Sequence, residues 1–218
     1  MNINHNTKSV QAFEIMRDLI LNGTWEPGFS IKIRETAKLL GISEMPVREA
    51  VRTLVENGLA VHRPHRGAVV SKLSVKEIQD FYRVRILLEG EAAKLGAEQI
   101  NDKQLKVMKQ HWTSLKKVVD AGNVIEALNI DADFLTALYE SSGNRELVNI
   151  IQSLWNRVQP YRILWASKSK EKSSLVIWKY KPMILEAAER KDGELAKRLT
   201  IDSLLEAEKE LEKLLMHD

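Results

Sequence analysis

The chain has 218 residues, of which 44% are hydrophobic and 29% charged, and this composition excludes a disordered or collagen-like protein. Its length suits one large domain or two modest ones. No run approaches the ~20 apolar residues that cross a bilayer, and the N-terminus is polar, so we expect a cytoplasmic protein without a membrane segment. The absence of cysteine excludes disulfides, cysteine-ligated zinc and thiol nucleophiles.

The excess of positive charge lies in the first third of the chain. Of the 33 basic and 30 acidic residues, ten and seven fall in residues 1–73, which leaves 23 of each in residues 74–218. A basic excess confined to one part of the chain hints at a polyanionic partner for that part, although an excess of this size also fits an ordinary surface.

In chain order, the first third predicts three helices and a hairpin. Apolar residues recur at helical spacing over about 8–22, a short helix over 34–40 ends at Gly41, and a third begins near Pro46 and ends at Asn57-Gly58. The runs 59–62 and 68–70 predict two strands joined by a basic turn. We therefore expect a DNA-binding domain over residues 1–73, with a helix-turn-helix at about 32–51 and a wing at about 59–70.

Residues 74–218 predict an all-helical domain. Ser74 and Glu77 have the spacing of a capping box, which marks the start of its first helix. Short connections between long helices are typical of an antiparallel bundle, so the expected fold class is mainly α, with a bundle of six or seven helices behind a small β-hairpin wing. The predicted helices are 75–98, 102–121, 124–142, 145–166, 173–190 and 193–216.

The third helix and the hairpin tip carry the residue types that DNA recognition requires. A recognition helix places its first turns in a major groove ~12 Å wide, and arginine reaches bases or phosphates from there. The alternative interpretation is a three-helix cap with a purely structural role, whose arginines are exposed to solvent and bind nothing. The expected contacts with double-stranded DNA are Ser43, Glu44, Met45, Arg48 and Arg52 on the helix, and Arg63, His65, Arg66 and Gly67 at the tip.

This stretch resembles the winged helix-turn-helix of GntR-family bacterial regulators. The resemblance implies a transcriptional repressor that binds a palindromic operator as a homodimer, and it adds Arg34 to the expected contacts. Glu44 departs from the family, which usually carries arginine there. A carboxylate accepts from cytosine N4 but cannot donate to guanine, so we expect an operator that differs at that base pair. The matching runs are Ile20–Gly23, Pro27–Gly28, Leu39–Ser43, Pro46–Leu54, Asn57–Leu59 and Arg66–Val70.

The helical part resembles the FCD effector-binding and dimerisation domain of the FadR-type branch of that family. The likeness rests on Asp80–Arg85 with Leu88-Glu89, Asp131–Leu135 with Ser142–Asn144, and Ile184–Ala187 with Asp192–Ala196. It implies a small-molecule effector, with an organic acid as the suggested class. The residues expected to bind this effector are Arg85, Asp131, Asn144, Trp155, Tyr161, Lys181 and Ser203.

Many members of this branch hold zinc or nickel with one aspartate and three histidines. Asp131 matches the aspartate, but Leu135, Lys181 and Ser203 stand at the histidine positions. A leucine and a protonated lysine cannot ligate a divalent metal, so we predict no metal site and no cofactor. Lys181 then supplies the positive charge, by pairing with Asp131 or with an anionic effector. The chain's histidines are too scattered to rebuild the site: His5, His62, His65, His111 and His217.

Three alternatives remain. Asp131 and Lys181, like Arg85 and Glu89 one helical turn apart, also fit structural ion pairs, and the tryptophans also fit core packing. A metal-dependent regulator would use Asp131, Asp133 and other carboxylates. A helical-bundle enzyme is the third alternative, but the sequence has no glycine-rich phosphate loop, no Gly-x-Ser-x-Gly and no His-Glu-x-x-His, so we expect no enzyme.

Overall fold

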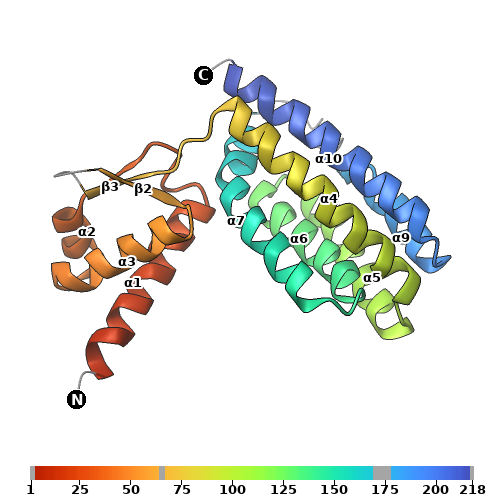
Figure 1. Ribbon diagram of the computed structural model, residues 1–218, viewed down its shortest axis with the longest axis horizontal. Coiled ribbons are helices and arrows are strands. Elements are labelled where there is room, and N and C mark those ends of the chain that lie inside the picture. The colour runs from red at the N-terminus through yellow and green to blue at the C-terminus, as the bar shows by residue number, and fades with distance from the viewer. Residues whose placement is uncertain (1–2, 64–66, 169–177, 217–218) are drawn as a thin grey trace. The chain divides into compact units, whose positions relative to one another are not determined.

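The computed structural model describes residues 3–63, 67–168 and 178–216 (Figure 1). Its contacts divide the chain into two compact units, residues 1–73 with 156–164 and residues 74–155 with 165–218. The main division therefore falls between Leu73 and Ser74. None of the helices in the described ranges is long and apolar enough to cross a membrane.

The N-terminal unit contains the expected three helices. The chain leaves the second helix through Gly41 at φ 65°, a left-handed conformation that glycine adopts without strain. Apolar side chains of the first helix, including Met16 and Ile20, pack with Val47 and Leu54 of the third helix in one buried core. The elements of the unit are α1 (Ile3–Leu21), β1 (Ser30–Ile31), α2 (Ile33–Leu40), α3 (Glu44–Glu56), β2 (Ala60–Arg63) and β3 (Gly67–Val70).

The wing is a three-stranded antiparallel sheet in the order β1-β3-β2. The sequence predicted two strands, and the structure adds β1, in which Ile31 pairs with Ala68. Gly67 makes this pairing possible, because its φ is 87° and a Cβ there would lie less than 3.0 Å from the Ile31 carbonyl oxygen. The hairpin tip at 64–66, with His65 and Arg66, lies outside the described residues.

The C-terminal unit is a bundle in which six helices are described. The predicted capping box at its start is present, since Glu77 Oε2 accepts from the Ser74 backbone N–H at 2.8 Å. The helix predicted at 173–190 begins at Lys181 as α9, and residues 169–177 are not described. The helices are α4 (Val75–Gln99), α5 (Asp102–Asp120), α6 (Val124–Glu140), α7 (Arg145–Lys168), α9 (Lys181–Glu189) and α10 (Gly193–Met216).

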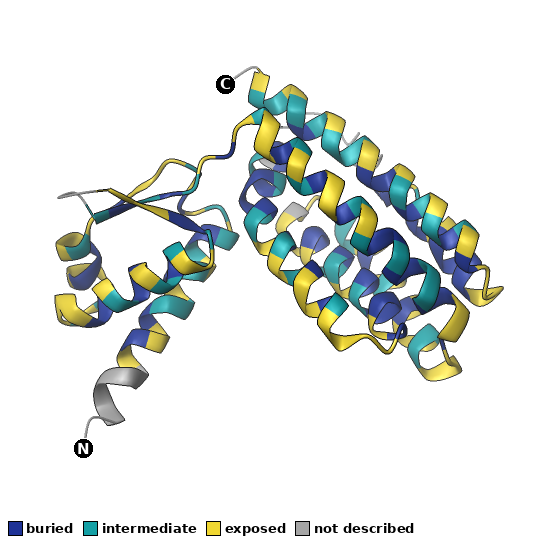
Figure 2. Ribbon diagram, viewed as in Figure 1, coloured by how far each residue is buried: buried dark blue, intermediate teal, exposed yellow. Residues whose placement is uncertain are grey.

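Apolar residues on the inner sides of these helices form the bundle core. Figure 2 shows buried positions along the inner sides of the helices and exposed positions along the outer sides. Phe134, Leu138 and Tyr139 of α6 are completely buried in this core together with Ile184 of α9. Gly96 lets α4 approach α6, because a Cβ there would lie less than 3.0 Å from the Leu138 carbonyl oxygen. Four of the polar residues expected to bind an effector are buried in this unit: Arg85, Asp131, Lys181 and Ser203.

Candidate DNA interface and effector site

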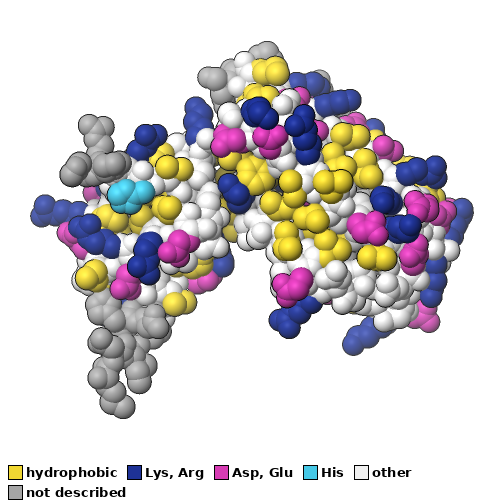
Figure 3. Space-filling view, viewed as in Figure 1, with side chains coloured by type: hydrophobic (Ala, Val, Ile, Leu, Met, Phe, Trp, Pro, Cys, Tyr) yellow, Lys and Arg dark blue, Asp and Glu magenta, His cyan; other side chains and the backbone are white. Residues whose placement is uncertain are grey.

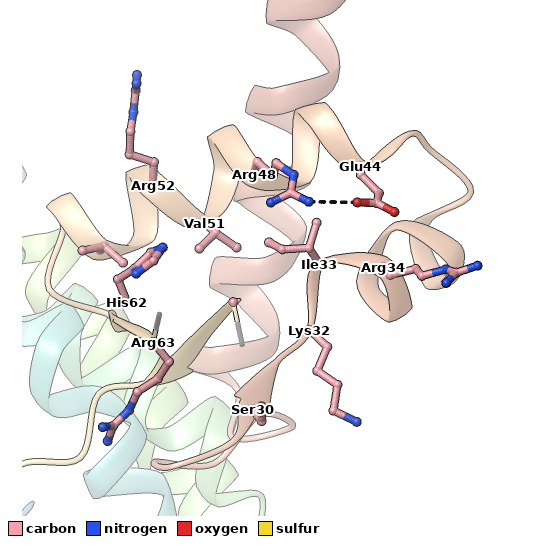
Figure 4. Close-up of a pocket in the computed structure, with 12 residues that line it drawn as sticks. Ser30, Lys32, Ile33, Arg34, Glu44, Arg48, Val51, Arg52, His62 and Arg63 are labelled. Carbon is pink, nitrogen blue, oxygen red and sulfur yellow. Dashed lines mark hydrogen bonds and ion pairs between the residues drawn. The ribbon is translucent and has the colours of Figure 1, made fainter. Parts of the chain in front are cut away.

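A groove of about 1170 Å³ runs over the N-terminal unit between the recognition helix α3 and the wing (Figure 4). Six of the residues expected to contact DNA line it: Arg34, Glu44, Arg48, Arg52, Arg63 and Gly67. The groove is therefore built from α2, α3 and the sheet at once, although the sequence suggested these residues as separate groups. The complete lining is Ser30, Lys32, Ile33, Arg34, Glu44, Arg48, Val51, Arg52, Val55, His62, Arg63 and Gly67.

Positive charge dominates the lining of this groove. Five of its residues are lysine or arginine and one, Glu44, is acidic. The side chains of Arg48 and Arg52 are 60% and 77% exposed, so both are open to a partner. Figure 3 shows basic side chains gathered on this face of the unit. A solvent-exposed basic groove beside a recognition helix fits the phosphates of double-stranded DNA.

The acidic residue of the groove is paired with a basic one. Arg48 donates from Nη2 to Glu44 Oε2 at 3.0 Å, and the two residues are one helical turn apart. Exposed pairs at this spacing contribute only about 0.3–0.5 kcal/mol. Both side chains can therefore leave each other when a base or phosphate offers a better partner.

Two other expected contacts on α3 are accessible but lie beside the groove lining. Ser43 precedes α3 with φ −71° and ψ 163°, and its hydroxyl makes no capping hydrogen bond. Met45 is 58% exposed, so its side chain is open to a partner. Sequence reasoning missed Ser30 and Lys32, because β1 is only two residues long and gives no periodic signal. It predicted the strand that contains His62 but assigned that residue no DNA contact.

A buried polar network lies in the helical unit. Glu89 of α4 is completely buried and accepts three hydrogen bonds: from Arg85 Nε at 2.6 Å, Trp155 Nε1 at 2.8 Å and Tyr139 O–H at 3.1 Å. The helical spacing of Arg85 and Glu89 indicated their pairing, and the structure confirms it. Sequence reasoning did not find Tyr139, which lies 50 residues from Glu89 in sequence.

The charges of this network follow from its surroundings. Burial lowers the pKa of Arg85, but the attraction of Glu89, Tyr82 and Tyr139 and the hydrogen bond to Glu89 together raise it by more, so its pKa lies above the ordinary value. Burial also raises the pKa of Tyr139 well above its usual range, and Glu89 raises it further. Arg85 is therefore charged and Tyr139 protonated at neutral pH, as their donation to Glu89 requires.

A second buried ion pair joins α6 and α9. Lys181 Nζ lies 2.9 Å from Asp131 Oδ1, and each side chain is only 3% exposed. Asp131 also contributes to the raised pKa of Tyr139, after the larger effects of burial and Glu89. The charge of Asp131 therefore acts on the same phenol that donates to Glu89, so the two buried ion pairs are linked electrostatically through Tyr139.

The remaining residues expected to bind an effector are distributed differently. Ser203 is buried on α10. Asn144 is exposed and caps α7 by accepting from the Leu147 N–H at 3.1 Å. Tyr161 belongs to the first unit, where its hydroxyl donates to the Ser71 carbonyl oxygen at 3.0 Å. The structure thus brings Arg85, Asp131, Trp155 and Lys181 together and leaves Asn144 and Tyr161 outside the network.

The two carboxylates named for a metal-dependent regulator differ in environment. Asp131 is buried and Asp133 is exposed. Within the described ranges, no three histidine, aspartate or glutamate side chains are grouped as metal ligands. Asp131 Oδ1 instead lies 2.9 Å from the Lys181 ammonium nitrogen.

Comparison with known proteins identifies both units. Residues 8–70 match the family model "Bacterial regulatory proteins, gntR family", and residues 80–206 match the FCD domain. The HTH-type transcriptional regulator YdhC of Bacillus subtilis is 27% identical over 190 residues, covering 87% of this chain and 84% of the relative. The HTH-type transcriptional repressor RspR of Escherichia coli is 24% identical, covering 90% and 85%. The fold matches the solved structure of McbR/YncC of E. coli with a TM-score of 0.84, at 22% identity over 95% of this chain and 98% of that one.

Proposed function

The chain belongs to the GntR family of bacterial transcriptional regulators with an FCD domain, and we propose that it is a repressor that binds a palindromic operator as a homodimer and responds to a small carboxylate metabolite. Its relatives are regulators of transcription, and it is not an enzyme. The observation that carries the proposal is the basic groove in which α3 and the wing converge.

DNA binding through this groove follows from its charge and its elements. Arg48 and Arg52 lie one turn apart along the exposed side of α3, so both can enter one major groove. Arg63 at the end of β2 lies across the groove from them and can bind the backbone beside it (Figure 4). The wing and the helix would then contact one half of the operator.

The dimer is supported by an apolar surface on the helical unit. Leu87 of α4 is 72% exposed, the highest value among the exposed large hydrophobic residues of the described chain, and Val84 one turn earlier is 43% exposed. Figure 3 shows hydrophobic side chains gathered over α4. A second copy that covers this surface would give the dimer two recognition helices, one for each half-site of a palindromic operator.

The effector class follows from the two buried cations. Among the described residues, Arg85 pairs with the Glu89 carboxylate and Lys181 with that of Asp131, and each cation has further N–H groups that can donate to an anion. Small mono- and dicarboxylates should therefore raise the melting temperature of the protein, whereas the corresponding amides, which have the same shape without the charge, should not. An acid that also weakens the operator complex would be an effector.

Selection of bound sequences from a random DNA pool tests the main proposal. We expect an inverted repeat whose half-sites are centred about 10 base pairs apart or a multiple of that spacing. Arg48→Ala should lose binding to the selected site, and Arg190→Ala is the matched control, because Arg190 pairs with Glu186 at the same spacing on α9 outside the groove. A pool without enrichment would refute DNA binding, and a motif without symmetry would refute the dimeric operator.

A further inference from the structure

We propose that the Lys181 ammonium takes the place of a divalent metal ion in the effector site, so that this regulator recognises its acid without any metal. The inference rests on the proposed function, because it concerns how the same site binds an anion. FCD domains that hold a metal use an aspartate and three histidines, and Asp131 is the one member of that set present here. The chemistry of the groups around Asp131 determines whether this site can hold a metal ion.

A metal ion would have to displace the partner that Asp131 already has. Lys181 Nζ lies 2.9 Å from Asp131 Oδ1 with both side chains 3% exposed, which is the distance of a direct ion pair. An ammonium has no free lone pair, so it cannot ligate a metal until it loses its proton. Lys181 and a divalent cation would therefore compete for the same carboxylate.

The neighbouring positions do not supply the missing ligands. Leu135 lies one turn after Asp131 on α6 and is buried in the apolar core with Ile184. Ser203 offers a neutral hydroxyl, which binds zinc or nickel poorly compared with imidazole. The residues present do not fit a transition metal.

The buried polar network around Arg85 nevertheless has capacity for a ligand. Arg85 is 4% exposed, and its hydrogen bond to Glu89 is donated by Nε, so the N–H groups of its terminal nitrogens can donate to a ligand. The hydroxyl of Tyr82, whose ring centroid lies 4.6 Å from the guanidinium carbon of Arg85, is buried without a partner among the described residues. Buried polar atoms without partners are unfavourable, and the oxygens of a carboxylate would satisfy these donors.

The charge balance separates this site from a metal site. Lys181 with Asp131 is neutral, whereas a divalent ion with Asp131 would carry one positive charge. Arg85 with Glu89 is neutral as well. An acid would therefore be bound by charged hydrogen-bond donors rather than by net positive charge, and metal chelators should not affect its binding.

Metal loading tests the inference without knowledge of the effector. The full-length protein, free of any histidine tag, is washed with EDTA, incubated with zinc or nickel, desalted and analysed by mass spectrometry for metal. We expect less than about a tenth of an equivalent, with the same value for Asp131→Ala, because tight binding needs a complete ligand set. About one equivalent in the wild type that is lost in Asp131→Ala would overturn the inference.

A gain-of-function variant tests the position of Lys181. The combined substitutions Leu135→His, Lys181→His and Ser203→His should create a site that takes up about one equivalent of zinc, with a zinc-dependent rise in melting temperature. Adding Asp131→Ala should abolish both. A variant with a wild-type circular dichroism spectrum that takes up no zinc would overturn the placement of Lys181 at the metal position. Should the variant not fold, the wild-type measurement still decides whether the protein is metal-independent.

Operator binding separates this inference from the proposed function. EDTA-treated wild-type protein should bind its selected operator with the same affinity with and without added zinc. Operator binding that requires zinc would overturn metal independence and leave the repressor proposal intact. Loss of operator binding under all conditions would instead count against the repressor proposal.

Discussion

Arg48 donates a hydrogen bond to Glu44 at 3.0 Å across one turn of the recognition helix, so the arginine expected to contact DNA is paired with the one acidic residue of the groove. The pair is exposed and weak, and it holds both side chains toward the same side of α3 (Figure 4). Together, the Glu44 carboxylate and the Arg48 guanidinium present one hydrogen-bond acceptor group and one donor group to neighbouring bases. Arginine at both positions would present two donor groups instead.

Removing Arg48 should weaken operator binding. We expect Arg48→Ala to lose about 1–3 kcal/mol of binding free energy, a factor of roughly 5 to 150, if the guanidinium contacts a base. A phosphate contact would instead lower the slope of log K against log salt by about 1 for all sequences alike. Titrations at several salt concentrations with operator and unrelated DNA distinguish these results, and unchanged affinity and slope would place Arg48 outside the interface.

Glu44 should determine the preferred base pair at one position of each half-site. Its carboxylate accepts from cytosine N4, whereas an arginine donates to guanine O6 and N7. We therefore expect Glu44→Arg to select a motif in which guanine replaces the base at that position. Glu44→Gln should bind unrelated DNA more tightly than wild type, because it removes a negative charge near the phosphates. An identical motif for wild type and Glu44→Arg would contradict this role.

Gly67 should be required for the wing. In Gly67→Ala the new methyl group would meet the Ile31 carbonyl oxygen at φ 87°, so we expect a loss of about 1–3 kcal/mol in the stability of the N-terminal unit. Gly28→Ala is the control, since Gly28 has φ 91° with no atom within 4 Å of the new carbon. Urea unfolding should show a larger loss for Gly67→Ala. Equal losses would mean that the positive φ at position 67, and not the close contact with β1, is the reason that glycine is required there.

The buried pair of Asp131 and Lys181 should show strong coupling. Lys181→Met leaves a buried carboxylate without its counterion, and we expect a loss of about 3–5 kcal/mol. The double substitution Asp131→Leu with Lys181→Met should recover most of this loss, because it removes both charges from the interior. Thermal and urea unfolding of the two single variants and the double variant give the coupling energy, and additive losses would show that the residues do not interact.

Tyr139 and Tyr82 should respond oppositely to loss of their hydroxyls. Tyr139→Phe removes a donor to the buried Glu89 carboxylate, so we expect a loss of about 1.5–3 kcal/mol. Tyr82→Phe removes a buried hydroxyl without a partner among the described residues and should be neutral or stabilising in the effector-free protein. Urea unfolding gives the change in stability of each variant, and the two are directly comparable because both substitutions remove only a hydroxyl group. A destabilised Tyr82→Phe would indicate that its hydroxyl is already satisfied.

Local signals made much of the fold predictable. The capping residues Ser74 and Glu77, the left-handed Gly41 and the apolar spacing of the long helices each act within a few residues, so the sequence alone locates them. The strand β1 escaped prediction because its two residues are held by pairing with β3, about 38 residues away in the chain. Half of the twelve groove residues were predicted as DNA contacts, whereas Ser30 of β1 and His62 of β2 join them through the sheet.

The sequence by itself determined the class of the protein and the position of its recognition helix, and it predicted Leu135, Lys181 and Ser203 at the positions of three expected metal ligands. The tertiary structure alone decided which of the polar residues form one site: Glu89 gathers Arg85, Tyr139 and Trp155, while Asn144 caps a helix at the surface. The physical reason is that a buried charge needs several partners at once, and these come from helices that only packing of the core brings together.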